Sequence, residues 1–152
     1  MTPEVGHSKL AESIGLCRNF LSLVQKPDVA EHNEIKALYR LCDELSLSAH
    51  SLEIPSGEFD SKPAACHTSV SALDIIQQRF ADLVAEPSID GGDPWLDLWE
   101  IVDDLKRIVG LFDAKQKDAA QFEFKYGFQT HWGLHLASLR YYLHRSLRFE
   151  DT

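Results

Sequence analysis

Apolar residues recur at intervals of three and four along most of the chain, and this spacing decides what the chain can fold into. On an α-helix, with about 3.6 residues per turn, residues spaced in this way share one face. We find no convincing segment with the strict apolar–polar alternation that predicts a half-buried strand. The pattern therefore predicts an all-α protein, with five amphipathic helices at about residues 8–25, 28–47, 68–85, 94–112 and 118–148.

Proline, glycine and aspartate residues mark the boundaries between these helices. Pro27 ends the first helix, and Asp28 is the expected N-cap of the second. Residues 91–94, Gly-Gly-Asp-Pro, predict a turn at the two glycines, an N-cap at Asp93 and the first residue of the next helix at Pro94. Residues 48–66 form the longest predicted loop. Because short connectors favour antiparallel neighbours, residues 1–152 are expected to form one domain, an up-and-down antiparallel bundle of about five helices.

The composition is that of an ordinary soluble globular protein, with 44% apolar and 26% charged residues. No apolar run reaches the roughly 20 residues that a membrane-spanning helix needs, so no membrane association is expected. The first residues lack the basic start and apolar block of a signal peptide. Cys17, Cys42 and Cys66 lack the spacing of a metal site and are predicted to be reduced thiols. These features predict a cytoplasmic protein.

The formal net charge is −9, and the excess of acidic residues lies in the first two thirds of the chain. Phosphate binding requires clustered lysine and arginine, so nucleic acid is not an expected ligand. An acidic body suits a basic protein partner, because opposite charges accelerate association. Alternatively, the charge serves only to keep the protein soluble.

The predicted fifth helix places an ionisable side chain within an apolar stripe. Phe128, Trp132, His135 and Leu139 fall on one helical face at spacings of three and four. An imidazole in a stripe that faces a core needs a polar partner. This segment is therefore the first place to look for a functional site.

A set of carboxylates on the predicted fourth helix is able to meet this segment. Asp97, Glu100 and Asp104 share one side of their helix. If the fourth and fifth helices pack antiparallel across their short connector, Asp97 lies level with His135 and Glu100 lies level with His131. We expect a cluster of carboxylates and histidines at one end of the bundle.

This cluster has two main interpretations and a weaker third one. His131 and His135 could bind a metal together with Asp97 or Glu100, as facing helices do in bundle cores. Alternatively, each histidine donates a hydrogen bond to a carboxylate and only completes the core. An acid–base role is the third interpretation. The His-Glu-x-x-His pattern of zinc proteases is absent, and so are phosphate-binding glycine loops and nucleophile elbows. No cofactor other than this metal is suggested.

The C-terminal part of the chain, about residues 93–145, resembles a family of uncharacterised bacterial helical proteins. The family pattern Asp-Leu-x-Asp-Ile-x-x-Asp-Leu corresponds to residues 97–105, in which Glu100 replaces an aspartate. The pattern Phe-x-x-His-Trp-Gly-x-His corresponds to residues 128–135. The resemblance implies a helical bundle and no particular activity. It singles out Asp97, Glu100, Asp104, His131, Trp132 and His135.

Two functions follow as hypotheses. The first is a non-enzymatic accessory module that binds a protein partner of basic character, for example an immunity protein that blocks a basic toxin. The second is a metal-binding bundle, with hydrolysis as the reaction, that uses Asp97, Glu100, His131 and His135. The sequence does not predict an oligomeric state.

Overall fold

The computed structural model describes residues 3–57, 70–83 and 92–150. These residues form helices and connecting segments, and none of them is in a β-strand. Within these ranges, none of the helices combines the length and apolar composition needed to cross a bilayer. The six helices are α1 (Pro3–Val24), α2 (His32–Ser51), α3 (Val70–Arg79), α4 (Pro94–Asp113), α5 (Lys117–Thr130) and α6 (Trp132–Glu150).

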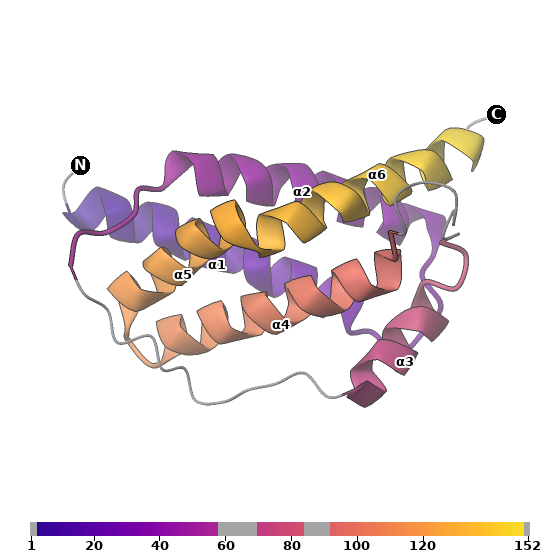
Figure 1. Cartoon of the computed structure of the whole chain (residues 1–152), viewed down its shortest axis with the longest axis horizontal. Coiled ribbons are helices and arrows are strands. Elements are labelled where there is room, and N and C mark those ends of the chain that lie inside the picture. Colours follow the sequence, from indigo (N-terminus) through magenta and orange to yellow (C-terminus); the bar gives the residue numbers. More distant parts are fainter. Residues whose placement is uncertain (1–2, 58–69, 84–91, 151–152) are drawn as a thin grey trace.

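Four long rods build the bundle, and α5 and α6 together make up one of them (Figure 1). Helix α1 packs against α2 and α4, while α6 packs against the same two helices. Neighbouring rods run in opposite directions, and the short helix α3 lies at one end of the bundle against α4. The all-helical bundle predicted by the periodicity is therefore confirmed.

The predicted fifth helix is in fact two helices. The sequence predicts one helix over residues 118–148, whereas the structure ends α5 at Thr130 and begins α6 at Trp132. His131 between them has φ −144° and ψ −79°, which is not helical. The expectation of one continuous helix was wrong, and the bundle contains six helices among the described residues instead of about five.

The second helix begins later than predicted and extends further. Its N-cap is Glu31, which exchanges capping-box hydrogen bonds with Glu34, so Asp28 does not cap it. The helix continues to Ser51, beyond the predicted end near residue 47. The predicted loop therefore starts after Ser51, and residues 58–66 of the predicted range lie outside the described part of the chain. The fourth helix begins as predicted, with Asp93 accepting hydrogen bonds from two backbone N–H groups of the first turn.

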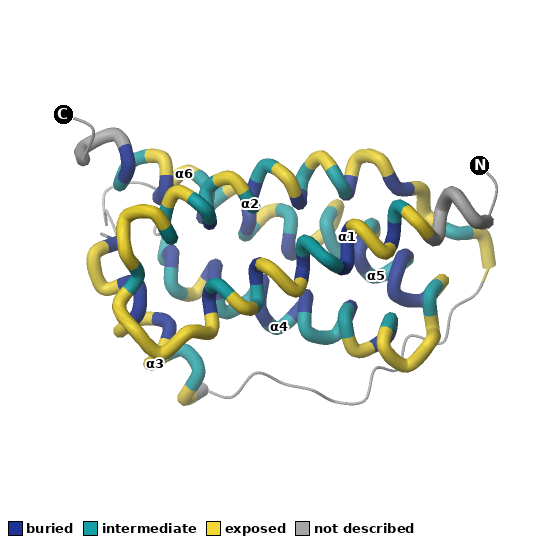
Figure 2. The backbone as a smooth tube through the Cα atoms, turned by 180° about the vertical axis from the view of Figure 1, so that it is seen from behind, coloured by how far each residue is buried: buried dark blue, intermediate teal, exposed yellow. Residues whose placement is uncertain are grey.

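The apolar faces of all the rods meet in one core, in which buried positions point inward (Figure 2). Burying a large apolar side chain stabilises a fold by about 1.5–3 kcal/mol, so this shared core is the main source of stability. Its largest fully buried apolar side chains include Trp132, Phe20, Phe80 and Phe124.

Arg79 is a buried arginine that joins α3 to the connector between α1 and α2. Its Nε donates to the carbonyl of Leu23 at 2.9 Å, and its Nη1 donates to the carbonyl of Asp28 at 2.6 Å. Its Nη2 donates to the carboxylate of Glu34 at 2.7 Å. The backbone carbonyl of Arg79 accepts a hydrogen bond from Ala30 N–H. One side chain thus replaces the water that these groups would otherwise bind.

The interaction with Arg79 changes the acidity of Glu34. The hydrogen bond from the guanidinium, helped by the backbone of Glu31, lowers the pKa of Glu34 from 4.5 to about 2. A carboxyl group whose pKa is lower in the folded state stabilises that state when it is ionised. This stabilisation is complete above pH 4.5, the ordinary value, and is lost as the pH falls towards 2.

We expect Arg79→Met to lower the free energy of unfolding by about 2–4 kcal/mol, because two carbonyls and a carboxylate lose their buried donor. Urea denaturation measures the change. The control is Arg18→Met, which removes an exposed ion pair with Asp113 and should lower stability by less than about 1 kcal/mol. Equal effects of the two substitutions would contradict the role assigned to Arg79.

The acid dependence of stability provides a separate test of Glu34. The difference in unfolding free energy between the wild type and Glu34→Gln should be constant well above pH 4.5 and should shrink between pH 4.5 and 2. Urea denaturation across this pH range measures it. A difference that stays constant down to pH 2 would show that the pKa of Glu34 is not lowered by folding.

Candidate metal site

Helix α4 presents three carboxylates to the α5–α6 rod. Asp97, Glu100 and Asp104 are spaced by three and four residues, which places them in one row along the helix. Asp97 and Asp104 are buried, whereas Glu100 is half-buried. A buried carboxylate requires a partner, and these partners come from the junction of α5 and α6.

The junction places two histidines opposite the carboxylates. Trp132 is fully buried and donates from its Nε1 to the carbonyl of Phe124 at 3.1 Å, which anchors the first residue of α6 in the core. A Cβ on Gly127 would lie 2.9 Å from the Trp132 ring. A Cβ on Gly133 would lie 2.0 Å from the carbonyl oxygen of Phe128. Both glycines are therefore required by the close approach of α5 to the start of α6.

Each histidine forms a hydrogen bond with one buried aspartate. The Nδ1 of His135 lies 2.9 Å from Oδ1 of Asp97, and the Nδ1 of His131 lies 2.5 Å from Oδ2 of Asp104. The Nε2 of His131 lies 3.5 Å from Oε2 of Glu100. The antiparallel register predicted that Asp97 lies at the height of His135 and Glu100 at the height of His131. These are the pairs that are in contact.

Opposite an ionised aspartate, these contacts require the proton on Nδ1 of each histidine. An ionised carboxylate only accepts hydrogen bonds, so the Nδ1 that faces it must donate. The Nε2 of a neutral imidazole is then unprotonated and holds a free lone pair. In this state His131 and His135 each keep one nitrogen available for a further ligand.

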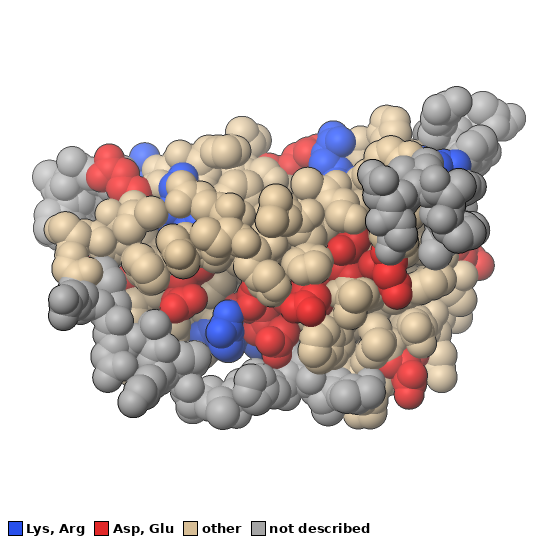
Figure 3. Space-filling model, in the orientation of Figure 1, with Lys and Arg blue, Asp and Glu red and all other residues tan. Residues whose placement is uncertain are grey.

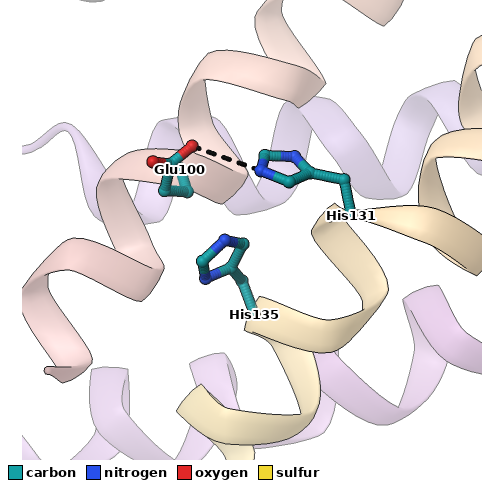
Figure 4. Close-up of side chains that lie close together, drawn as sticks. All are labelled: Glu100, His131 and His135. Atoms are coloured by element: carbon teal, nitrogen blue, oxygen red, sulfur yellow. Dashed lines mark ion pairs between the residues drawn. The ribbon is translucent and has the colours of Figure 1, made fainter. Parts of the chain in front are cut away.

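Glu100, His131 and His135 converge on one point (Figure 4). One ligand atom from each of the three residues can be chosen so that all lie within 4.8 Å of one another. The two imidazole rings are nearly perpendicular, with their centroids 4.9 Å apart. The side chains of Glu100, His131 and His135 are 27%, 46% and 26% exposed. The cluster is therefore open to solvent on one side and bounded by Asp97 and Asp104 on the other.

The site is predominantly acidic. Acidic side chains lie over α4 along its border with the α5–α6 rod, with a basic group among them (Figure 3). Arg107 donates to Oδ1 of Asp104 at 2.7 Å, and the sequence analysis missed this residue although it lies three positions after Asp104. Burial raises the pKa of Tyr142 on α6, and the charge of Asp97 raises it further. Such a field favours a bound cation.

Of the residues singled out from the sequence, the five polar ones come together and Trp132 does not join them. Trp132 packs against Phe124 and Phe128, with ring centroids 5.1 Å and 5.0 Å away. Its role is to fix the start of α6, from which both histidines are positioned. The apolar stripe predicted for this region is divided, because Phe128 belongs to α5 and Leu139 belongs to α6.

Comparisons with known proteins add information on the fold alone. No family model matches the chain, and no curated protein matches it. Among solved structures, the chain is similar to protein BF1032 from Bacteroides fragilis, a structural genomics target, with a TM-score of 0.76 and 16% sequence identity. The similarity covers 91% of this chain and 95% of that protein. At this identity the similarity shows a shared helical fold and nothing about the site.

The close contact at Gly133 provides a test of the junction. Gly133→Ala should lower the free energy of unfolding by more than about 2 kcal/mol, because its Cβ would collide with the Phe128 carbonyl. The control is Gly110→Ala in α4, where a Cβ meets nothing within 4 Å. This substitution should stabilise the helix by up to about 1 kcal/mol. Urea denaturation of the two variants measures the difference. If both substitutions stabilise the protein, the junction is not packed as described.

Proposed function

We propose that this protein binds one divalent transition metal ion through Glu100, His131 and His135. The observation that carries the proposal is the 3.5 Å distance between Nε2 of His131 and Oε2 of Glu100. With Nδ1 protonated towards Asp104, two lone-pair acceptors face each other there and repel unless a cation lies between them. The ligands of a tetrahedral zinc ion, at about 2.0–2.1 Å from the metal, are themselves separated by about 3.3 Å.

The hydrogen bonds of the two histidines support the same proposal. A metal-bound histidine usually donates its second ring nitrogen to a carboxylate or carbonyl, which fixes its tautomer and orientation. Asp97 and Asp104 would act in this way on His135 and His131. Both aspartates are buried, so they hold the imidazoles in place without competing for the ion.

The alternative is a core network in which His131 is an imidazolium between Asp104 and Glu100. That network explains the contacts of His131, but it gives the Nε2 atom of His135 no role. It also accounts poorly for the exposure of His131, since 46% of its side chain is open to solvent. A purely structural polar network is expected to be buried and fully hydrogen-bonded.

The ligand set restricts which ion is bound. Two imidazoles and one carboxylate suit zinc, and they also suit iron(II) in the arrangement of two histidines and one carboxylate. Either ion needs more ligands than the three found among the described residues, and water would complete the coordination. A hydrolytic reaction, in which the metal activates that water, is the catalytic form of this proposal.

A protein-binding role is a second candidate, favoured by an open groove of about 520 Å³ between α1 and α2. Leu47 on its rim is one of the most exposed large apolar side chains of the described residues. Leu47→Asp would abolish the binding of such a partner and leave metal binding unchanged. The basic character of the partner and membership of the uncharacterised bacterial family stay predictions from the sequence.

Metal binding is tested by comparing His135→Ala with a matched histidine variant. Zinc titrated into the wild type should bind with a stoichiometry near one, and His135→Ala should weaken binding by at least about 100-fold. The control is His144→Ala on the same helix, which removes a hydrogen bond to Tyr39 and should leave zinc affinity unchanged. Isothermal titration calorimetry measures both.

Zinc binding by the wild type separates the two interpretations of the cluster, because His135→Ala removes the hydrogen bond to buried Asp97 and lowers stability under either one. If the cluster only completes the core, His135→Ala should lower stability and the wild type should bind no zinc. Wild-type protein that binds no zinc would overturn the proposed function.

A further inference from the structure

The proposed metal would have its remaining coordination positions on the exposed side of the cluster. Asp97 and Asp104 close the inner side, whereas the rings of His131 and His135 and the carboxylate of Glu100 reach solvent. Zinc takes at least four ligands and iron(II) usually takes up to six. At least one position is therefore available to a molecule that arrives from solvent.

On each of the two helices, an exposed leucine directly precedes a residue of the cluster. Leu134 directly precedes His135 on α6, and Leu96 directly precedes Asp97 on α4. With about 100° between successive residues of a helix, each leucine lies on the outer flank of the residue that follows it. Leu134 is 67% exposed, and Leu96 is exposed as well. A ligand on the metal would meet apolar surface on either side.

The charges at the site do not attract anions. Three carboxylates on α4 surround the metal position, and two of them are buried, where charges are weakly screened. The nearby guanidinium of Arg107 is already paired with Asp104. With a divalent ion bound, the three carboxylates balance the charges of the ion and of Arg107, so the site has no net positive charge to attract a phosphate or carboxylate.

From these features, and resting on the proposed metal site, we propose that the open position takes a neutral ligand. Its nitrogen or oxygen donor would coordinate the metal, and its apolar group would lie against Leu134. The substrate or ligand class is thus a neutral molecule with an apolar group, and not a phosphate or a carboxylate.

Cobalt(II) provides the test, because its visible absorption changes when a ligand enters the coordination sphere. The cobalt-loaded protein is titrated with imidazole, 4-phenylimidazole and azide as the probes. We expect 4-phenylimidazole to bind about tenfold more tightly than imidazole, since its phenyl ring loses contact with water. Azide should bind more weakly than either.

Leucine variants locate the apolar contact. Leu134→Ser should remove most of the advantage of 4-phenylimidazole over imidazole while the protein still binds cobalt. The matched control is Leu47→Ser on α2, a leucine of similar exposure that lies away from the site and should leave this advantage unchanged.

The outcomes separate the two proposals. Failure to bind cobalt would overturn the metal site and this inference with it. Cobalt binding without any spectral change on adding the probes would show a closed coordination sphere and overturn this inference alone. Azide binding more tightly than 4-phenylimidazole, or no effect of Leu134→Ser, would overturn the assigned ligand class.

Discussion

Two hydrogen bonds, one from α6 and one from the α5–α6 junction to α4, determine how the functional part of this bundle is arranged. Asp97 and Asp104 are buried on α4 and require hydrogen-bond donors; Arg107 supplies one to Asp104, and the others come from across the bundle. His135 and His131 supply these donors through Nδ1. The same contacts turn the opposite nitrogens towards Glu100. A requirement of folding, the pairing of buried carboxylates, thereby orients the groups that we propose to bind a metal.

The break between α5 and α6 allows both histidines to reach α4. The fully buried Trp132 fixes the first residue of α6, and Gly127 and Gly133 leave room for the close contacts around it. His131 lies at the break, outside regular helical geometry. The short pattern at residues 131–135 therefore serves two purposes. Trp132 and Gly133 pack the junction, whereas His131 and His135 belong to the candidate site.

Much of the helical architecture could be predicted from the sequence, because apolar periodicity and the Asp93 cap are local signals. The break at His131 could not, since apolar residues continue at helical spacing on both sides of it. The residues of α4 and α6 that lie opposite each other could also be predicted, because they follow from the antiparallel register of the two helices. Arg79 was missed because its three acceptors come together only in the folded chain.

We propose that both histidines hold their protons on Nδ1 and offer Nε2 to a metal ion. Long-range proton–nitrogen NMR correlation spectra of the histidine rings report this directly. For the metal-free protein at neutral pH, we expect Nδ1–H tautomers for His131 and His135, and a large shift of both Nε2 signals when zinc is added. An Nε2–H tautomer in either ring, or Nε2 signals that zinc leaves unchanged, would contradict it.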